Sequence, residues 1–193
     1  MLRRFALSLV TAAVLAASPV LLAQVRIWSA AGLTGIVDEA DLGIHSFNST
    51  GSVSIKSSVA GGTLDIRFPV QTVPDLLPPQ PGDCAEMRVN LRDTGAGARV
   101  IVRLMALSIF PGSGTQLTPL AAIDSDALPP IADPTQYRSA KTCLNTPSPG
   151  SEAIFDHAFF TYYVEAQLIK SSGSANPGLM SVQICPSQDA CDP

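Results

Sequence analysis

Short segments in which apolar and polar residues alternate recur along this chain, and they constrain its fold more than any other feature. In "TLDIRF", for example, Leu64, Ile66 and Phe68 share one side of an extended chain, and Asp65 and Arg67 share the other. The segments with this period of two are 52–56, 63–68, 86–92, 99–104, 160–168 and 179–184. Such alternation is typical of antiparallel strands with one buried and one wet face.

Turns rich in glycine and proline separate these segments, and helical periodicity is nearly absent. Many short strands with such turns predict an all-β fold, an antiparallel β-sandwich that is jelly-roll-like. The turn "DTGAGA" predicts a hairpin of 86–92 with 98–110, and "FPGSGT" predicts a second turn into 116–124. Because proline has no amide hydrogen to donate, we expect the proline-rich segments 73–83 and 125–136 to be loops.

The stretch "FDHAFFTYYVEAQLIK", residues 155–170, is the most aromatic part of the chain and suggests either a binding site or a strand. Counting by twos places these residues on one face: Phe160, Tyr162, Val164, Ala166 and Leu168. Tyr163 and Glu165 fall on the other face, which we expect to be wet. Asp156 and His157 precede the alternation and are expected to be capping or loop groups. Aromatic and β-branched residues suit a pleated, half-buried surface, so we interpret this stretch as a strand.

The first residues, "MLRRFALSLVTAAVLAASPVLLAQ", have the layout of a secretory signal peptide, with a basic start, an apolar run and small residues near its end. A cut after Ala23 gives a signal peptide at 1–23 and a single β-sandwich domain at 24–193. A membrane anchor is the alternative, but Pro19 interrupts the apolar run, which is short for a span of about 20 residues. We therefore expect a secreted or periplasmic protein that does not insert into a membrane after signal cleavage.

The charge of the chain argues against one class of partner. The formal net charge is −4, and losing Arg3 and Arg4 with the signal peptide takes it from −4 to −6. An acidic chain does not attract nucleic acid or anionic lipid electrostatically. We expect no nucleic-acid partner.

All four cysteines, Cys84, Cys143, Cys185 and Cys191, follow the predicted signal peptide. An even number in an exported chain predicts two disulfides, and three connectivities are open. We favour Cys84–Cys143 with Cys185–Cys191, because the second pair closes a tight loop around "CPSQDAC", whose Pro186 suits a turn. Zinc is disfavoured because the chain has no C-x-x-C pair.

Exposed aromatic rings on a sheet face or at loop tips could bind carbohydrate, and three rings are candidates. They are Trp28, Tyr137 and Tyr163, and Glu165 lies beside Tyr163 on the face expected to be wet. In "RIWSA", Ile27 and Trp28 point to opposite sides of a strand, so one of them could be exposed. Packing within the fold is the alternative explanation for each ring taken alone.

The sequence contains no recognisable catalytic constellation, and we assign no catalytic residue. The only histidines are His45 and His157, and no G-x-S-x-G motif occurs. A glycosidase needs two facing carboxylates, and Glu86 and Glu165 could meet if their strands were neighbours. Arginines also occupy outward positions of the predicted strands, so a cross-strand ladder of opposite charges is the favoured alternative.

A structural calcium ion is the one cofactor that the sequence suggests. Asp124, Asp126 and Asp133 place three carboxylates in one predicted loop, and calcium takes oxygen ligands from loops. The segment "VDEAD" at 37–41 offers three more carboxylates. Neither segment has EF-hand spacing, and solvated acidic loops are the alternative on an acidic protein.

The segments "GARVIVRLMALSIFPGSGTQLTPLAAIDSD" and "FDHAFFTYYVEAQLIKSSGSANPGLMSVQIC" resemble a set of uncharacterised exported bacterial β-sandwich proteins. In that set, an arginine-flanked strand precedes an acidic loop, and a later aromatic strand leads through a Gly-Pro turn to a final strand. The resemblance covers about 83–185. It implies no activity and transfers no catalytic residue.

Together these observations predict a non-catalytic exported protein that binds an extracellular surface, a polysaccharide or another protein. A secreted glycan hydrolase that uses outward carboxylates is the second hypothesis, and a structural role in an envelope or matrix is a third. A concave cleft holding two carboxylates free of arginine partners would favour the hydrolase. A flat sheet face with paired charges would argue against it.

Overall fold

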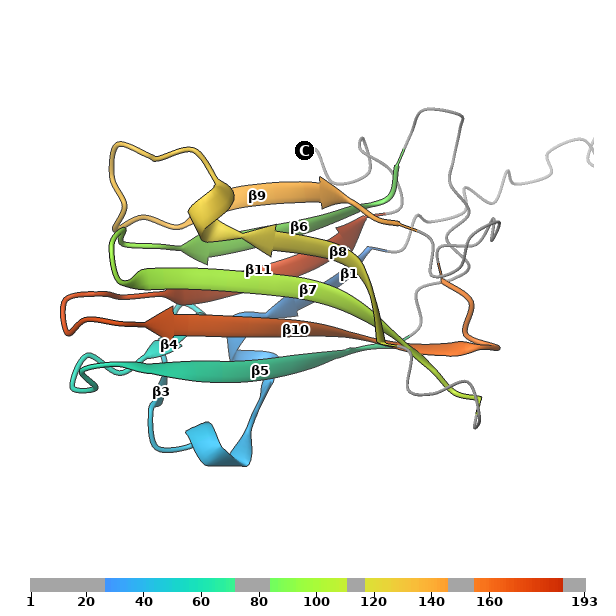
Figure 1. Cartoon of the computed structure of the whole chain (residues 1–193), viewed down its shortest axis with the longest axis horizontal. Helices are drawn as coiled ribbons and strands as arrows, with labels where there is room; N and C mark the ends of the chain where they lie inside the picture. The colour runs from blue at the N-terminus through green and yellow to red at the C-terminus, as the bar shows by residue number, and fades with distance from the viewer. Residues whose placement is uncertain (1–26, 72–83, 111–116, 146–154, 186–193) are drawn as a thin grey trace, which may run out of the picture.

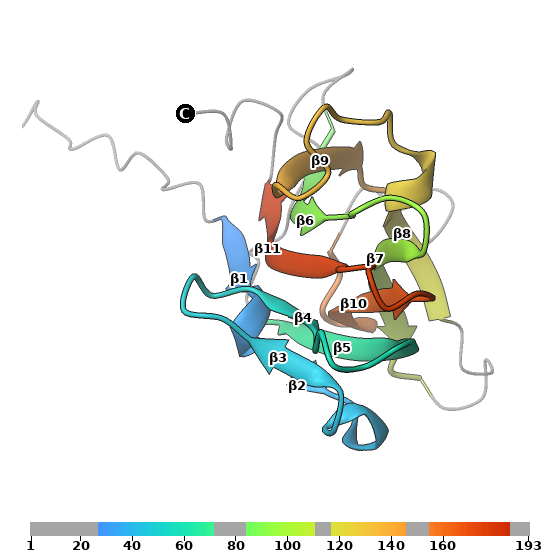
Figure 2. The same cartoon turned by 90° about the vertical axis from the view of Figure 1, so that its left-hand side faces the viewer.

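Two antiparallel sheets pack face to face in the part of the chain that the computed structural model describes, residues 27–71, 84–110, 117–145 and 155–185. Figure 1 looks onto one sheet with the other behind it, and Figure 2 shows both layers from one end. The predicted all-β antiparallel sandwich is confirmed. Within these ranges, no helix is long and apolar enough to cross a membrane. The predicted signal peptide at 1–23 lies outside them.

Six of the described strands form the first sheet, in the order β3-β4-β11-β6-β9, with β1 paired to β11. They are β1 (Trp28–Ala31), β3 (His45–Phe47), β4 (Val53–Ile55), β6 (Glu86–Arg92), β9 (Arg138–Cys143) and β11 (Gly178–Cys185). The five-stranded sheet has the order β2-β5-β10-β7-β8. Its strands are β2 (Ile36–Val37), β5 (Gly62–Val70), β7 (Ala98–Ser108), β8 (Leu117–Asp124) and β10 (Phe160–Lys170). Three short 3-10 helices connect them, η1 (Gly32–Thr34), η2 (Glu39–Asp41) and η3 (Ser125–Ala127).

The chain changes sheet at most connections, which makes the sandwich jelly-roll-like. It passes from β4 to β5, from β5 to β6 and from β6 to β7, each time between layers. The predicted hairpin of β6 with β7 is therefore wrong. Gly95 and Gly97 in this connection have φ angles of 89° and 96°, a left-handed conformation that suits glycine, and the connection leads from one sheet into the other. β7 pairs antiparallel with β8, as the second predicted turn requires, although residues 111–116 of that turn lie outside the described ranges.

The core lies between the sheets and consists largely of the apolar faces that alternation predicts. The buried residues of β5 and β10 include Leu64, Ile66, Phe68, Val164, Ala166 and Leu168. In β11 the alternation fails at one position. The pairing of β11 with β6 shifts register between Leu179 and Ser181, so Leu179 is buried where the pattern predicts Met180. A bulge adds one residue to a strand and changes which side chains point inward.

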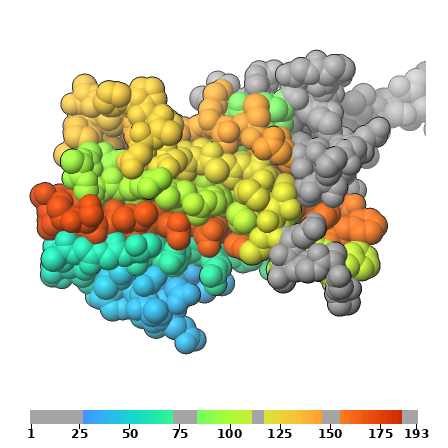
Figure 3. Space-filling model, viewed as in Figure 1, coloured from blue at the N-terminus to red at the C-terminus, as the bar shows by residue number. Residues whose placement is uncertain are grey.

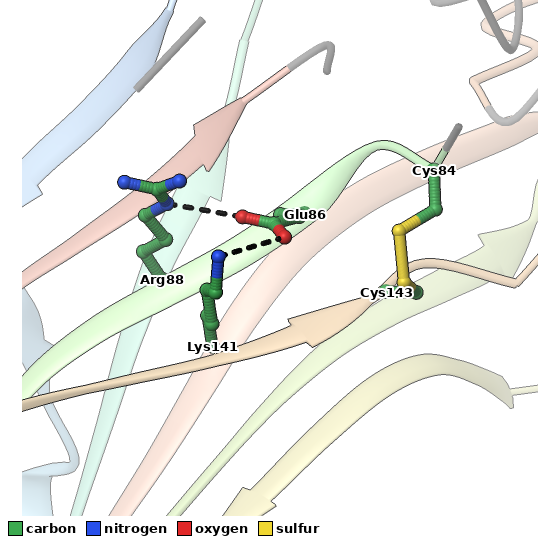
Figure 4. The surroundings of a disulfide bond; sticks show 5 residues. All are labelled: Cys84, Glu86, Arg88, Lys141 and Cys143. Atoms are coloured by element: carbon green, nitrogen blue, oxygen red, sulfur yellow. Dashed lines mark hydrogen bonds and ion pairs between the residues drawn. A yellow bond between two sulfur atoms is a disulfide. The ribbon is translucent and has the colours of Figure 1, made fainter. Parts of the chain in front are cut away.

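The predicted Cys84–Cys143 disulfide is confirmed. It joins the residue before Ala85 and β6 to the last residue of β9, with an S–S distance of 2.00 Å and a Cα–Cα distance of 5.5 Å (Figure 4). The loop that it closes is long, so the bond restricts the unfolded chain strongly. The other predicted pair, Cys185–Cys191, includes a residue outside the described ranges.

Candidate ligand-binding face

The outer face of the five-stranded sheet is uncovered by any described element, and β10 runs along its middle between β5 and β7. Figure 3 shows the side chains of β5, β10, β7 and β8 as one continuous surface. The alternation in β10 is confirmed: Tyr162, Val164 and their partners face the core, whereas Tyr163 and Glu165 are half-exposed on the outer face. We call this surface the open face.

Tyr163 lies near the centre of the open face. Its cross-strand neighbours are Pro69 on β5 and Met105 on β7. The Tyr163 hydroxyl makes no hydrogen bond with any described residue, although its ring is half-buried. A flat aromatic ring with an unengaged hydroxyl can both stack against an apolar surface and form a hydrogen bond.

The next row of the open face is charged. Glu165 lies opposite Arg67 on β5 and Arg103 on β7. Its Oε2 is 3.6 Å from Arg103 Nη1, and both side chains are partly exposed. Arg67 is exposed and forms no ion pair with any described residue. The predicted cross-strand ladder of opposite charges is therefore present around Glu165, where Arg103 forms an ion pair and Arg67 does not.

A chain of side-chain hydrogen bonds continues from this row. Arg103 Nη1 donates to Gln167 Oε1 at 3.1 Å, and Gln167 Nε2 donates to Asp65 Oδ1 at 2.9 Å. The three groups come from β7, β10 and β5, so the chain crosses the middle of the sheet. Donors and acceptors of this kind hold one another in place while staying partly accessible to a ligand.

One end of the open face is apolar. Phe159 precedes β10 and is 48% exposed, and Phe110 follows β7 and is 53% exposed. Their ring centroids are 5.3 Å apart. Ile109 donates its backbone N–H to the Phe159 carbonyl, which aligns the two segments. This pair was not among the predicted site residues, but the alternation of Phe159, Thr161 and Tyr163 along one face points to Phe159.

The other end of the open face leads into a cleft of about 700 Å³, lined by the β6–β7 connection and by residues that follow β8. Ile169 on β10 and Arg99 on β7 line it, and Arg138 lines it from β9. Arg138 Nη1 and Nη2 donate to the carbonyls of Pro129 and Ser125, whereas its Nε is buried and has no hydrogen-bond partner among the described residues. The cleft thus combines apolar walls with guanidinium groups.

The residues proposed for calcium belong to this end of the molecule but are engaged in other contacts. Asp124 accepts a hydrogen bond from Arg99 Nε at 3.0 Å, which lowers the pKa of the Asp124 carboxyl. Asp126 lies 3.3 Å from the same guanidinium. Asp133 accepts hydrogen bonds from Thr135, chiefly from its hydroxyl, and the pKa of Asp133 is lowered as a result. Within the described ranges, no three acidic, histidine or cysteine side chains form a metal-binding group, and calcium binding stays a prediction.

The second acidic segment also uses its carboxylates locally. Asp38 accepts a hydrogen bond from the Ala40 N–H at the start of η2, and Asp41 accepts one from the Asp65 N–H. These contacts stabilise the connection between β2 and β3, beside the edge of the five-stranded sheet.

The other two candidate rings lie on or next to the six-stranded sheet, Trp28 in β1 and Tyr137 immediately before β9. Trp28 lies opposite Ile184, which is fully buried, and the indole packs against the core. Of the pair Ile27 and Trp28, the exposed residue is therefore Ile27, at 42%. Tyr137 donates its hydroxyl to Ser52 Oγ at 2.7 Å. The structure therefore does not bring Trp28 or Tyr137 together with Tyr163 and Glu165.

The two carboxylates of the hydrolase hypothesis also lie on different sheets. Glu86 is on β6, and its Oε2 and Oε1 are 3.1 Å from Arg88 Nε and 3.5 Å from Lys141 Nζ (Figure 4). The expectation that Glu86 lies on a wet face is wrong: its side chain is 4% exposed. Glu86 lies opposite Cys143 in the sheet, so two cations and a disulfide-bonded residue surround it. Glu86 and Glu165 cannot act on one glycosidic bond.

The residues before β10 have the capping role that the sequence predicts. The Asp156 N–H donates to the Tyr162 hydroxyl at 2.6 Å, and Asp156 Oδ1 accepts from the Ala158 N–H. Burial raises the pKa of Tyr162. The His157 ring lies 5.0 Å from that of Tyr162. These contacts fix the start of the strand that carries Tyr163 and Glu165.

No protein-family model and no curated protein matches this sequence. Among solved structures, the chain is similar to a xylan-binding module, CBM15, at 11% identity, with a TM-score of 0.47 and coverage of 83% of this chain and 96% of that one. It is similar to the C-terminal CBM6 of LamC from Zobellia galactanivorans at 11% identity, with a TM-score of 0.43 and coverage of 83% and 99%.

A third similar structure is a family two carbohydrate esterase from Cellvibrio japonicus, at 9% identity and a TM-score of 0.40. This match covers 83% of the present chain but spans only 33% of the esterase. Likenesses of this degree do not identify a ligand, so the ligand is inferred from the surface of the chain itself.

Proposed function

We propose that this chain is an exported, non-catalytic protein that binds an extracellular polysaccharide along the open face. The observation that carries the proposal is the arrangement around Tyr163, a half-exposed ring with an unengaged hydroxyl. Beside it lies a row of side chains that can donate and accept hydrogen bonds, Glu165, Arg103 and Gln167. A sugar ring has the matching chemistry, with apolar C–H faces and a rim of hydroxyl groups.

The length of the open face favours a polymer over a single sugar. The strand β10 contains 11 residues, Phe160–Lys170. At about 3.3 Å per residue, such a strand is roughly 35 Å long. A glycan lying along it would meet exposed rings at one end, Tyr163 near the middle and hydrogen-bonding groups beyond.

The two carboxylates named by the hydrolase hypothesis, Glu86 and Glu165, are not placed to act together. Glu86 is buried between Arg88 and Lys141, and Glu165 is paired with Arg103 on the other sheet. An inverting or retaining glycosidase needs two carboxyl groups within about 10 Å across one cleft. The confirmed Cys84–Cys143 disulfide supports export, since such bonds persist in oxidising compartments.

Affinity electrophoresis and calorimetry with a polysaccharide panel would test the proposal. The panel contains xylan, mannan, laminarin, polygalacturonate, alginate and carrageenan. We expect at least one to bind, and Tyr163→Ala to weaken that binding by about fivefold or more, since central tyrosines are among the residues whose truncation costs over about 1 kcal/mol. Phe47→Ala is the matched control, because Phe47 is a ring 45% exposed on the six-stranded sheet.

Two results would overturn the proposal. The first is that no polysaccharide binds. The second is that Tyr163→Ala and Phe47→Ala weaken binding equally, because the open face would then have no special role. An assay for released reducing ends, run on the same panel, is expected to show no hydrolysis.

A further inference from the structure

Arg67 is the cation of the open face that lacks an acidic partner among the described residues. It is exposed on β5, whereas the two other arginines of this face are engaged. Arg103 contacts Glu165 and Gln167, and Arg99 contacts Asp124 and Asp126. Glu165 lies directly opposite Arg67 but makes its ion pair with Arg103 on the other side.

The position of Arg67 relative to Tyr163 is fixed by the sheet register. Tyr163 pairs with Pro69, and Glu165 pairs with Arg67, so Arg67 and Tyr163 are diagonal neighbours on adjacent strands. Diagonal neighbours lie about 7–8 Å apart and are within reach of each other when the side chains are long or aromatic. A sugar ring on Tyr163 could therefore present a substituent to the Arg67 guanidinium.

We infer that the ligand of the open face is an anionic polysaccharide, with a carboxylate or sulfate group bound by Arg67 and its sugar ring stacked on Tyr163. The inference rests on the proposed function and names the class of polysaccharide. A guanidinium offers a planar fork of donors that matches the oxygen pairs of carboxylate and sulfate groups. Arg67 supplies this charge complementarity, because its guanidinium is exposed and forms no ion pair with a described residue.

The overall charge of the chain makes local recognition necessary. With a formal charge of −4, the chain has no general attraction for a polyanion. Binding of an acidic glycan would therefore depend on individual guanidinium groups and on the carboxylate beside them. Removing the Glu165 charge should then strengthen binding, because it takes away a repulsive group and releases Arg103.

The test uses the mature protein and calorimetric titration with a matched pair of ligands, polygalacturonate and fully methyl-esterified polygalacturonate. These share a backbone and differ in the charge of the carboxyl group. Alginate and carrageenan distinguish a carboxylate ligand from a sulfate ligand, and xylan and mannan represent neutral glycans. We expect the charged form of at least one polymer to bind, and its neutral counterpart to bind much more weakly.

Arg67→Gln should reduce the affinity for the anionic polymer by about tenfold or more, since hydrogen bonds to charged groups are among the strong ones. Arg67→Lys should retain part of the affinity, because it keeps the charge but loses the fork. Lys56→Gln is the charge-matched control, an exposed cation after β4 of the six-stranded sheet, and should leave the affinity unchanged. Glu165→Gln should raise it.

The outcomes separate this inference from the proposed function. If a neutral glycan binds, Tyr163→Ala abolishes the binding and Arg67→Gln has no effect, the function stands and the anionic ligand is overturned. If no polymer of either kind binds, both fail. If Arg67→Gln and Lys56→Gln weaken binding equally, net charge rather than a site is responsible, and the inference is overturned.

Discussion

The two outer faces of the sandwich contain similar residue types but use them differently. Each face has a tyrosine, arginines and a glutamate. On the six-stranded sheet, the Tyr137 hydroxyl donates to Ser52, and the Arg92 guanidinium lies 5.0 Å from the Tyr137 ring centroid. On the open face, the Tyr163 hydroxyl and the Arg67 guanidinium have no such partners among the described residues.

The difference shows that residue type alone does not separate a binding group from a structural one. A polar group whose partners lie within the fold stabilises the fold, and one without partners is available to a ligand. Glu86 and Glu165 follow the same rule, because Glu86 is buried with two cations whereas Glu165 is paired loosely at the surface. The predictions below test whether the six-stranded sheet controls stability and the open face controls binding.

Removing the Cys84–Cys143 disulfide should have the largest effect on stability. The bond closes a loop with a sequence separation of 59. The chain-entropy model gives a stabilisation of about 4 kcal/mol for such a loop. Cys84→Ala with Cys143→Ala should therefore lower the free energy of unfolding by about that amount in a denaturant titration. Affinity measured well below the melting temperature should stay at the wild-type value, and a loss of affinity there would contradict the separation of the two faces.

Tyr137→Phe should destabilise the fold without changing ligand binding. The substitution leaves the hydroxyl of Ser52, a residue that is 1% exposed, without its bond to Tyr137. An unsatisfied buried hydroxyl costs about 1–3 kcal/mol. The measurement is thermal unfolding of the mature protein. The double variant Tyr137→Phe with Ser52→Ala is the control and should recover part of the loss, because both partners are then removed.

Tyr163→Phe should show the opposite pattern, with unchanged stability and weaker binding. The Tyr163 hydroxyl has no partner in the described structure, so its removal breaks no internal bond. If the hydroxyl bonds to the ligand, the affinity should fall severalfold, since a neutral hydrogen bond contributes about 1 kcal/mol. A fall in melting temperature equal to that of Tyr137→Phe would show that the two tyrosines have the same role.

The sequence predicts the faces of strands well because alternation is a local property. Leu64, Ile66 and Phe68 of β5 are buried as the pattern requires, and Glu165 lies on the outer face. The pairing of strands is not a local property. The prediction of a β6–β7 hairpin was wrong because a glycine-containing turn can lead either to an adjacent strand or to the opposite sheet.

The candidate site was predictable only in part, for a similar reason. The sequence offers both Tyr163 and Tyr137 as candidate rings, and the structure separates them by the hydrogen bond from Tyr137 to Ser52, a residue 85 positions away in the chain. Glu86 occupies an outward position by alternation, but in the structure its side chain is only 4% exposed and forms ion pairs with Arg88 and Lys141. The exposed pair Phe110 and Phe159 arises because β7 and β10 are neighbours, which no local pattern shows.

The smallest expected effect is on stability and concerns the ion pair of Arg99 with Asp124, at the cleft end of the open face. The hydrogen bond from Arg99 lowers the pKa of Asp124 in the folded protein. A lowered folded-state pKa means that the stabilisation is present above the unfolded-state value, near about 3.9 for aspartate, and is lost as the pH falls through the folded-state pKa. Asp124→Asn should therefore lower the melting temperature slightly at pH 7, and this difference should vanish in strongly acidic solution.

Glu39→Gln, a change of equal charge at an exposed residue, should cause no such pH-dependent difference. A difference between wild type and Asp124→Asn that stays constant from pH 7 into acid would show that shape, and not charge, is what Asp124 contributes.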